Sequence, residues 1–433
     1  MHWTRRLALP VIVASLVAGC GGSAGTSIAP GSSPVGSVAP VPSVTPSPAV
    51  ASFPTVAAPS GSGAPPGGVA TPLPRTVAEI ARLQAAVAAD PDDAASQRDL
   101  GLALIQRIRE TADPSLYAPA TTALETARRL TPDDALVLVG IAGIQLGKHE
   151  FAAALVTGRA AVALSPNLAT AHAVVVDALV ELGRYDEADA AANEMLGIAT
   201  DLSTLSRISY LAELRGKLQI ALTAINRAAG SPGLPPENVA FADALLGNLL
   251  VYTGDPGGAA DAYARALTLV PAHAPSLAGE ARQAVAAGRL DDAIALYQRA
   301  ADILPLPEYV IALAETQLAS GQRDAATRNL KLAEAEIGLF RASGVVVDLD
   351  LALFEADHGD PKAALRYAQV AYDATPTVRA ADALGWALHR LGRDREAEQR
   401  AREALRLGSR DPLFRFHAGA IEAAVGRPAA LGD

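Results

Sequence analysis

Cysteine is almost absent from this chain of 433 residues, because Cys20 is the only one. The rest of the sequence therefore offers no possible disulfide and no thiolate metal site. Aromatic residues are also scarce, at 4% of the chain, although 50% of all residues are hydrophobic. Packing must then rely on alanine, leucine and valine, which suit closely approaching helices better than sheets. The composition therefore predicts an all-α protein.

The apolar segment near the N-terminus is too short to cross a membrane. It runs over the twelve residues 7–18 and follows Arg5 and Arg6, whereas a spanning helix needs roughly 20 residues. We interpret residues 1–19 as a cleavable signal peptide. The segment ends in Leu-Val-Ala-Gly before Cys20, which resembles the bacterial lipobox, whose cysteine becomes acylated. An ordinary secretory signal with an incidental cysteine is the alternative.

Charged residues are missing altogether from residues 21–74, which contain twelve prolines. Such a segment cannot bury enough apolar surface to offset the entropy lost on ordering. We therefore expect residues 20–74 to be a lipidated cysteine followed by a disordered linker, and residues 75–430 to be the folded domain. The formal net charge of −10 argues against binding to nucleic acid, because like charges repel.

Glycine recurs at intervals of 33 to 38 residues, and alanine follows each of the first eight glycines after five residues. Glycine suits the turn that ends a helix because it adopts positive φ without steric cost. Alanine suits a close crossing of two helices. Each repeat is therefore predicted to be two short helices. The glycines are Gly147, Gly183, Gly216, Gly254, Gly288, Gly321, Gly359, Gly392 and Gly426, and the alanines are Ala152, Ala188, Ala221, Ala259, Ala293, Ala326, Ala364 and Ala397.

Proline followed by acidic residues marks the other boundary of the repeat, as in Pro91-Asp92-Asp93. The proline ends one helix, and the aspartate caps the next. One hairpin cannot bury its own apolar stripe, so neighbouring hairpins must stack into a continuous core. The pattern predicts about nine hairpins over residues 92–408, a preceding helix at 76–89 and a closing helix at 412–425.

The repeat resembles the tetratricopeptide repeat (TPR) family, whose second helix follows the pattern A-x3-F-x2-A-x4-P. The resemblance implies an α-solenoid, a right-handed superhelix of about nine TPR-like hairpins whose first helices line a concave groove. The family's aromatic positions in the first helix are mostly alanine or leucine here, which implies slimmer packing. Four copies of the second-helix pattern stand in phase: Ala120, Leu124, Ala127 and Pro132; Ala259, Tyr263, Ala266 and Pro271; Ala293, Tyr297, Ala300 and Pro305; and Ala364, Ala368, Ala371 and Pro376.

Motifs for catalysis or metal binding do not accompany the repeats. HExxH, CxxC, Walker and dinucleotide-binding patterns are all missing from them. Glu355 and His358 form one Glu-x-x-His pair, but the second such helix of a carboxylate metal site is absent. A histidine at a helix end is explained by the helix dipole. The sequence therefore predicts no catalytic residue, no metal site and no cofactor, and thus no enzyme.

The family resemblance implies that polar residues of the first helices face the groove. Trp386 stands out among them, because large amphipathic rings are enriched in binding hot spots. The alternative for Trp386 is packing against the last hairpin as a cap. The groove residues implied by the phase of the repeat are Asp177, Glu181, Tyr210, Glu213, Asn248, Tyr252, Arg282, Glu315, Asp382, Trp386, His389 and Arg390.

These features lead to a hypothesis about function. We expect a lipid-anchored, extracytoplasmic scaffold that binds a peptide or helix of another envelope or secreted protein in its groove. Acyl chains on Cys20 would hold it to a bacterial membrane. The location would be the outer face of the plasma membrane, or the outer membrane in a two-membrane cell. A receptor or sensor for a peptide, glycan fragment or other small ligand is the alternative.

Overall fold

The computed structural model describes residues 75–231 and 233–426, and in this part of the chain every regular element is a helix. The all-α prediction is therefore confirmed. The expected signal peptide, the lipid-attachment Cys20, the linker up to residue 74 and the last four residues of the expected domain, 427–430, lie outside the described residues.

Twenty α-helices and one short 3-10 helix, η1, follow one another along the described residues. They are α1 (Arg75–Ala89), α2 (Ala94–Thr111), η1 (Pro114–Leu116), α3 (Tyr117–Leu130), α4 (Ala135–Gly147), α5 (Phe151–Leu164), α6 (Ala169–Glu181), α7 (Tyr185–Ile198), α8 (Leu202–Leu214), α9 (Leu218–Ala229), α10 (Pro236–Tyr252), α11 (Pro256–Leu269), α12 (Ala274–Ala286), α13 (Leu290–Ile303), α14 (Pro307–Ala319), α15 (Arg323–Ala342), α16 (Asp348–His358), α17 (Pro361–Ala374), α18 (Val378–Arg390), α19 (Asp394–Ala404) and α20 (Pro412–Ala424).

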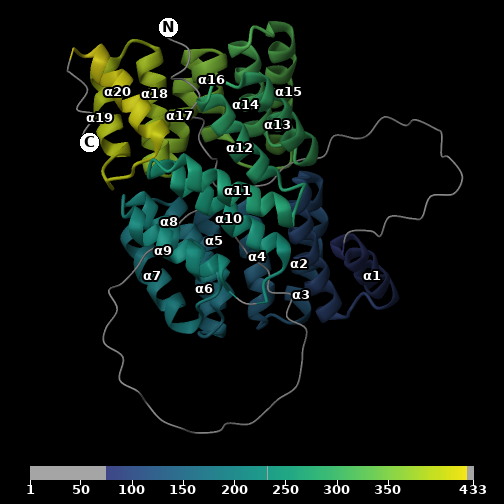
Figure 1. The fold of residues 1–433 in the computed structure, drawn as a ribbon. Coiled ribbons are helices and arrows are strands. Elements are labelled where there is room, and N and C mark those ends of the chain that lie inside the picture. Colours follow the sequence, from purple (N-terminus) through teal and green to yellow (C-terminus); the bar gives the residue numbers. More distant parts are fainter. Residues whose placement is uncertain (1–74, 232, 427–433) are drawn as a thin grey trace, which may run out of the picture.

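Helices pair along the chain into hairpins, and the hairpins stack side by side (Figure 1). Each even-numbered helix from α2 to α18 packs against the helix that follows it, which makes nine hairpins in the described residues. Helix α1 precedes them and α20 follows them. The predicted array of about nine hairpins with one extra helix at each end is confirmed.

Glycine at the hairpin turn and alanine five residues later set the geometry of most repeats. Gly183 has a φ of 71°, and Ala188 is fully buried. The first of these repeats differs from the expectation. There His149, not Gly147, takes the positive φ of 61°, and the buried alanine five residues on is Ala154, whereas Ala152 is exposed. The predicted register was therefore wrong by two residues in this hairpin.

The reason for the shift is a tyrosine that occupies the space beside Gly147. The hydroxyl of Tyr117 donates a hydrogen bond to the Gly147 carbonyl at 2.9 Å. A β-carbon on Gly147 would overlap the same tyrosine. This glycine therefore permits a close approach of α3 to the end of α4, and the turn follows it.

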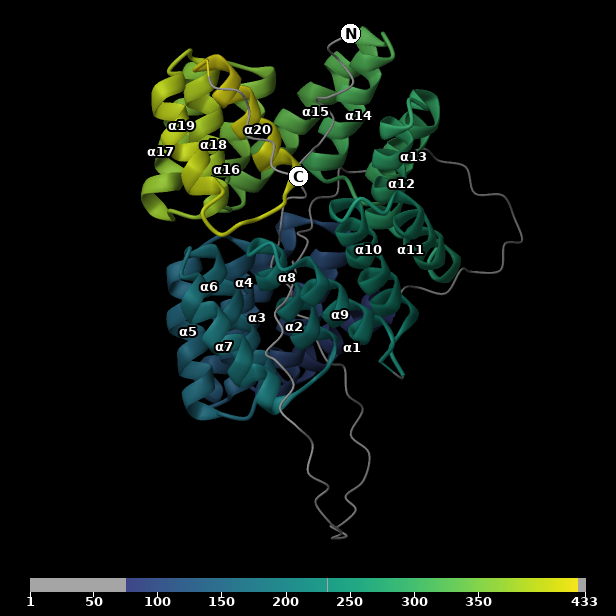
Figure 2. The same cartoon turned by 60° about the vertical axis from the view of Figure 1, so that its left-hand side comes forward.

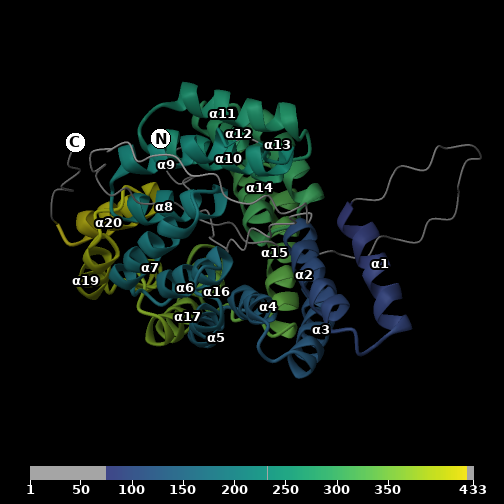
Figure 3. The same ribbon diagram turned by 90° about the horizontal axis from the view of Figure 1, so that it is seen from below.

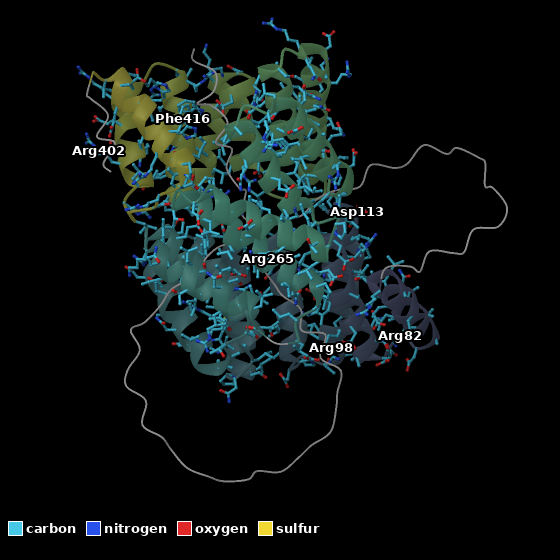
Figure 4. All side chains as sticks on the ribbon, in the orientation of Figure 1. Arg82, Arg98, Asp113, Arg265, Arg402 and Phe416 are labelled. Atoms are coloured by element: carbon cyan, nitrogen blue, oxygen red, sulfur yellow. The ribbon has the colours of Figure 1, made fainter. Side chains whose placement is uncertain are left out.

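Ion pairs near the molecular surface join helices both between neighbouring hairpins and within one hairpin, at arginines labelled in Figure 4. Arg98 of α2 pairs with Asp134, the N-cap of α4, at 2.9 Å, and Arg265 of α11 pairs with Asp243 of α10 at 2.7 Å. Such partly exposed pairs contribute about 1 kcal/mol or less each. Burial of the apolar stripes therefore provides most of the stability.

The superhelix is wound so tightly that its second turn rests on its first. Figures 1 and 2 both show α16–α20 lying against α4–α9. The Val346 amide donates to the Lys148 carbonyl at 3.1 Å, and the Val378 amide donates to the Tyr185 hydroxyl at 3.0 Å across 193 residues of chain. Val378 and Phe414 share a hydrophobic core with residues of α4–α8.

The contact between turns extends to the other side of the molecule. There α15 lies beside α2 (Figure 3), and residues of both helices belong to one hydrophobic cluster, among them Leu104 and Ile108 of α2 and Ile337 and Phe340 of α15. In the first superhelical turn, the segments that connect the two helices of a hairpin face the second superhelical turn. There they meet the loops that join one hairpin to the next, as Lys148 and Val346 show. The concave side is therefore partly covered by the protein itself.

We predict that Gly216→Ala is more destabilising than Gly288→Ala. Both glycines have positive φ, 66° and 73°, so each substitution should cost about 1 to 2 kcal/mol. Only at Gly216 would the β-carbon overlap a second-turn atom, the Gly408 carbonyl oxygen, whereas the space beside Gly288 is open. This overlap should add about 2 kcal/mol. Thermal unfolding followed by circular dichroism measures the difference, and equal losses would contradict stacking of the turns.

Candidate functional site

The polar residues of the first helices differ widely in their exposure. Five of the predicted groove residues are buried, one is exposed and the others are half-buried. The buried ones are Asp177, Tyr210, Glu213, Asp382 and Trp386, the half-buried ones are Glu181, Asn248, Tyr252, Arg282, Glu315 and His389, and the exposed one is Arg390.

Asp177 makes a structural ion pair within the stack. Arg207 of α8 donates two hydrogen bonds to its carboxylate, at 2.7 and 2.6 Å, and both side chains are buried. The same guanidinium also donates to the Ser203 carbonyl at 3.0 Å. A bidentate pair with its remaining donors satisfied holds α6 and α8 in register. Both carboxylate oxygens of Asp177 therefore take part in a pair inside the stack.

A small network joins Asn248 of α10, Tyr263 of α11 and Arg282 of α12. The Asn248 side-chain oxygen accepts from the Tyr263 hydroxyl at 2.7 Å and from the Arg282 guanidinium at 2.6 Å. Arg282 as a whole residue remains half-buried. Among α10, α12 and α14, Arg282 is the one lysine or arginine side chain.

Trp386 packs against the closing helix. Its ring stacks on His417 of α20 at 4.1 Å between centroids, and it lies 5.9 Å from Phe416, which is labelled in Figure 4. Its indole nitrogen donates to Asp357 at 3.0 Å, and only 6% of the residue is exposed. This packing is the geometry of the capping alternative, and it leaves little of the ring for a partner.

Neighbours of Trp386 are also engaged in contacts inside the last hairpins. Asp382 is bonded to His417 at 2.8 Å, and His389 is bonded to Asp394 at 2.6 Å. The Arg390 guanidinium lies over the Trp386 ring, 5.9 Å from its centre. Of these predicted groove residues, Arg390 alone keeps an exposed side chain.

Glu355 and His358 face different partners. His358 is bonded to Glu315 of α14 at 3.0 Å, whereas the Glu355 carboxylate accepts from the Asp360 amide at 2.7 Å. Among the residues that the structure describes, no group of three or more histidine, aspartate or glutamate side chains is placed to hold a metal ion.

Stacking of the two turns creates a charged group that the sequence analysis did not predict. Arg379 at the start of α18 interacts electrostatically with acidic and phenolic groups of both turns. His149, after α4, in turn interacts with two of those acids. We call this set the inter-turn cluster; it consists of His149, Glu181, Tyr210, Asp350, Arg379 and Asp411.

Carboxyl groups of the inter-turn cluster are held partly away from water. Burial raises the pKa of Glu181, of Asp350 and of Asp411, and Arg379 lowers it by a smaller amount. Burial together with Asp411 raises the pKa of the adjacent Glu213 to about 8. Burial in the folded protein therefore disfavours the ionised form of these carboxyl groups.

Comparison with known proteins finds distant likenesses among solved structures. No protein-family model matches the chain, and no curated protein matches it. Among solved structures, PilF of Pseudomonas aeruginosa is 16% identical with a TM-score of 0.39 over 46% of this chain and 90% of that chain. PilW, described as a type IV pilus biogenesis factor, is 18% identical with a TM-score of 0.40 over 46% and 92%.

A tetratricopeptide repeat protein from Parabacteroides merdae is similarly distant, at 16% identity and a TM-score of 0.40 over 56% of this chain and 97% of that chain. Likenesses at this level identify no partner and no activity for this chain.

We predict that Glu213→Gln relieves a loss of stability at alkaline pH. A pKa raised from 4.5 to about 8 means that the folded protein binds more protons than the unfolded chain between these values. The free energy of unfolding therefore falls as the pH rises through this range, by up to about 4 kcal/mol from this group. The variant should gain stability over wild type from pH 5 to pH 8.5.

Urea unfolding at several pH values measures this gain, with Glu334→Gln on the exposed face of α15 as the control. The buried Glu336, whose pKa burial also raises to about 8, stays in all three proteins and does not affect the difference. A constant offset between Glu213→Gln and wild type across this pH range would contradict the prediction.

Proposed function

We propose that this chain is a lipid-anchored scaffold that binds another protein of the bacterial envelope, or a secreted protein, through its stacked hairpins. The observation that carries the proposal is the uninterrupted array of nine hairpins between α1 and α20. Such arrays present an extended surface on which each repeat contributes a few side chains. The proposal assigns the protein no catalytic role.

The half-buried residues of the middle hairpins are the ones we propose to meet the partner. Tyr252, Arg282 and Glu315 lie on α10, α12 and α14, and each keeps part of its side chain accessible. Tyrosine and arginine are the residue types that most often dominate binding energy at interfaces. A peptide or helix in an extended contact with these three helices would use their accessible polar groups.

Anchoring through Cys20 is proposed from the sequence. The lipobox-like residues before the cysteine and the short apolar segment support it. None of the helices in the described residues has the length and apolar character that a membrane span requires. Two or three acyl chains would give durable attachment, at about 0.8 kcal/mol for each buried CH₂.

Substitution of the cysteine tests the anchor. We expect the wild-type protein to incorporate labelled palmitate and to enter the detergent phase in Triton X-114 partitioning. The Cys20→Ala variant should lose the label and move to the aqueous phase, because no acyl chain can be attached. Retention of the variant in the detergent phase would exclude lipidation as the anchor.

A matched pair of arginine variants tests the docking surface. Arg282→Ala should weaken capture of a cross-linked partner by about tenfold or more, since loss of an interface hot spot costs over 1 kcal/mol. Arg328→Ala removes the same charge from the exposed face of α15 and should leave capture unchanged. Circular dichroism checks that both variants fold. Equal capture by the two variants would refute the proposed surface.

A further inference from the structure

Helix α15 differs from the other second helices of the hairpins. It has 20 residues, whereas the others in the described part of the chain have 11 to 14. It also packs little against α16, the first helix of the next hairpin, whereas α13 and α17 pack closely against the helices that follow them. The stack is therefore looser after α15, and this helix is long enough to offer a surface of its own.

An apolar stripe runs along the exposed side of α15. Leu332 and Leu339 are 41% and 46% exposed, and Ala335 and Ala342 are exposed as well. These four residues follow one another at intervals of three, four and three residues, which places them on one side of the helix, as in the seam of a coiled coil. Gly338, beside them, has open space where a β-carbon would lie. A stripe of this kind fits a second helix.

The alternation of large and small residues indicates how that second helix would run. The stripe reads leucine, alanine, leucine, alanine. In an antiparallel pair of two α15 helices centred on residue 337, Leu332 lies opposite the second copy's Ala342, and Ala335 lies opposite its Leu339. Each leucine then fills the space beside an alanine, as close packing requires. A parallel pair would instead set leucine against leucine and leave gaps between the alanines.

The charges beside the stripe favour the same arrangement. Glu334 and Arg341 are both exposed and stand seven residues apart, so they lie on the same flank of the stripe. Neither makes an ion pair among the described residues, although Arg289 and Asp292 of α13 do pair within their own helix. In the antiparallel pair, Glu334 of each copy faces Arg341 of the other. A parallel pair would bring like charges together.

We propose that α15 binds the α15 helix of a second copy of this chain in an antiparallel pair. A twofold axis beside residue 337 relates the two copies, so that each presents the same patch to the other. The stripe is smaller than the roughly 800 Å² per partner of a standard interface, so the dimer is weak and reversible. It uses no residue of α10, α12 or α14, on which we propose that a partner protein docks.

Sedimentation equilibrium of the full-length protein in a density-matched neutral detergent measures this association. We expect a monomer–dimer equilibrium with a dissociation constant of roughly 10 to 100 μM. Glu334→Arg sets like charges opposite each other at both symmetry-related pairs and should weaken the dimer by about tenfold. Glu334→Arg/Arg341→Glu restores opposite charges and should recover the wild-type affinity. Asp261→Arg makes the same change of charge at an exposed position of α11 and should have no effect.

Cross-linking through a single cysteine tests the direction of the pair. In a Cys20→Ala background, Gly338→Cys lies next to the twofold axis, so oxidation should join two chains by a disulfide. Arg328→Cys lies nine residues from residue 337, which separates the two thiols by roughly 27 Å along the helices at 1.5 Å per residue. It should remain uncross-linked, whereas in a parallel pair both variants would cross-link alike. Electrophoresis without reducing agent measures the yield.

A wild-type protein that stays monomeric up to about 0.5 mM would overturn the proposal, and this includes the case in which only a helix of another protein covers the stripe. Equal dimerisation of Glu334→Arg and wild type would also overturn it, as would equal cross-linking of the two cysteine variants. All substituted side chains on α15 are exposed, so the variants should fold, which circular dichroism checks. Loss of capture by Arg282→Ala with an intact dimer would leave the α15 pair standing, so the two proposals fail separately.

Discussion

Close backbone approach between the two superhelical turns is the constraint on which the rest of this structure depends. Gly216 faces the Gly408 carbonyl with no room for a β-carbon, and Val346 and Lys148 share a main-chain hydrogen bond. An open solenoid would leave the polar groups of its first helices in water. Here the two turns pack against each other, and burial raises the pKa values of Glu181 in the first turn and of Asp350 and Asp411 in the second.

The local part of the fold was predictable because its signals are local. Tyr263 and Ala266 occupy positions of the second-helix pattern, and both are fully buried between neighbouring helices. Glycine and alanine five residues apart fix the turn and the crossing that follows it. The one hairpin with the wrong register, α4–α5, has Gly147 in contact with Tyr117, which belongs to the preceding hairpin and lies 30 residues away. A pattern read along one hairpin does not contain that contact.

The inter-turn cluster could not be predicted for a related reason. Glu181 and Arg379 are 198 residues apart in the sequence, and nothing in a repeat reveals where one turn of a superhelix meets the next. Asp411 has the sequence features of an ordinary capping residue, and it does cap α20 by accepting from the Leu413 amide at 2.8 Å. Its second role, as a neighbour of Arg379, follows only from the winding. The exposure of Asp177 and Asp382 likewise depends on neighbours that the repeat pattern does not name.

The bond between Val378 and Tyr185 spans 193 residues, and this has a consequence for the order of folding. Joining the ends of a flexible chain of this length costs about 5 kcal/mol in entropy. That cost falls once the intervening hairpins are already stacked, because a preformed arc brings the two segments together. Neighbouring hairpins should therefore stack first, and the contact between the two superhelical turns should form last. A mutation in a middle hairpin that alters its angle would then misalign Val378 and Tyr185 even though it touches neither residue.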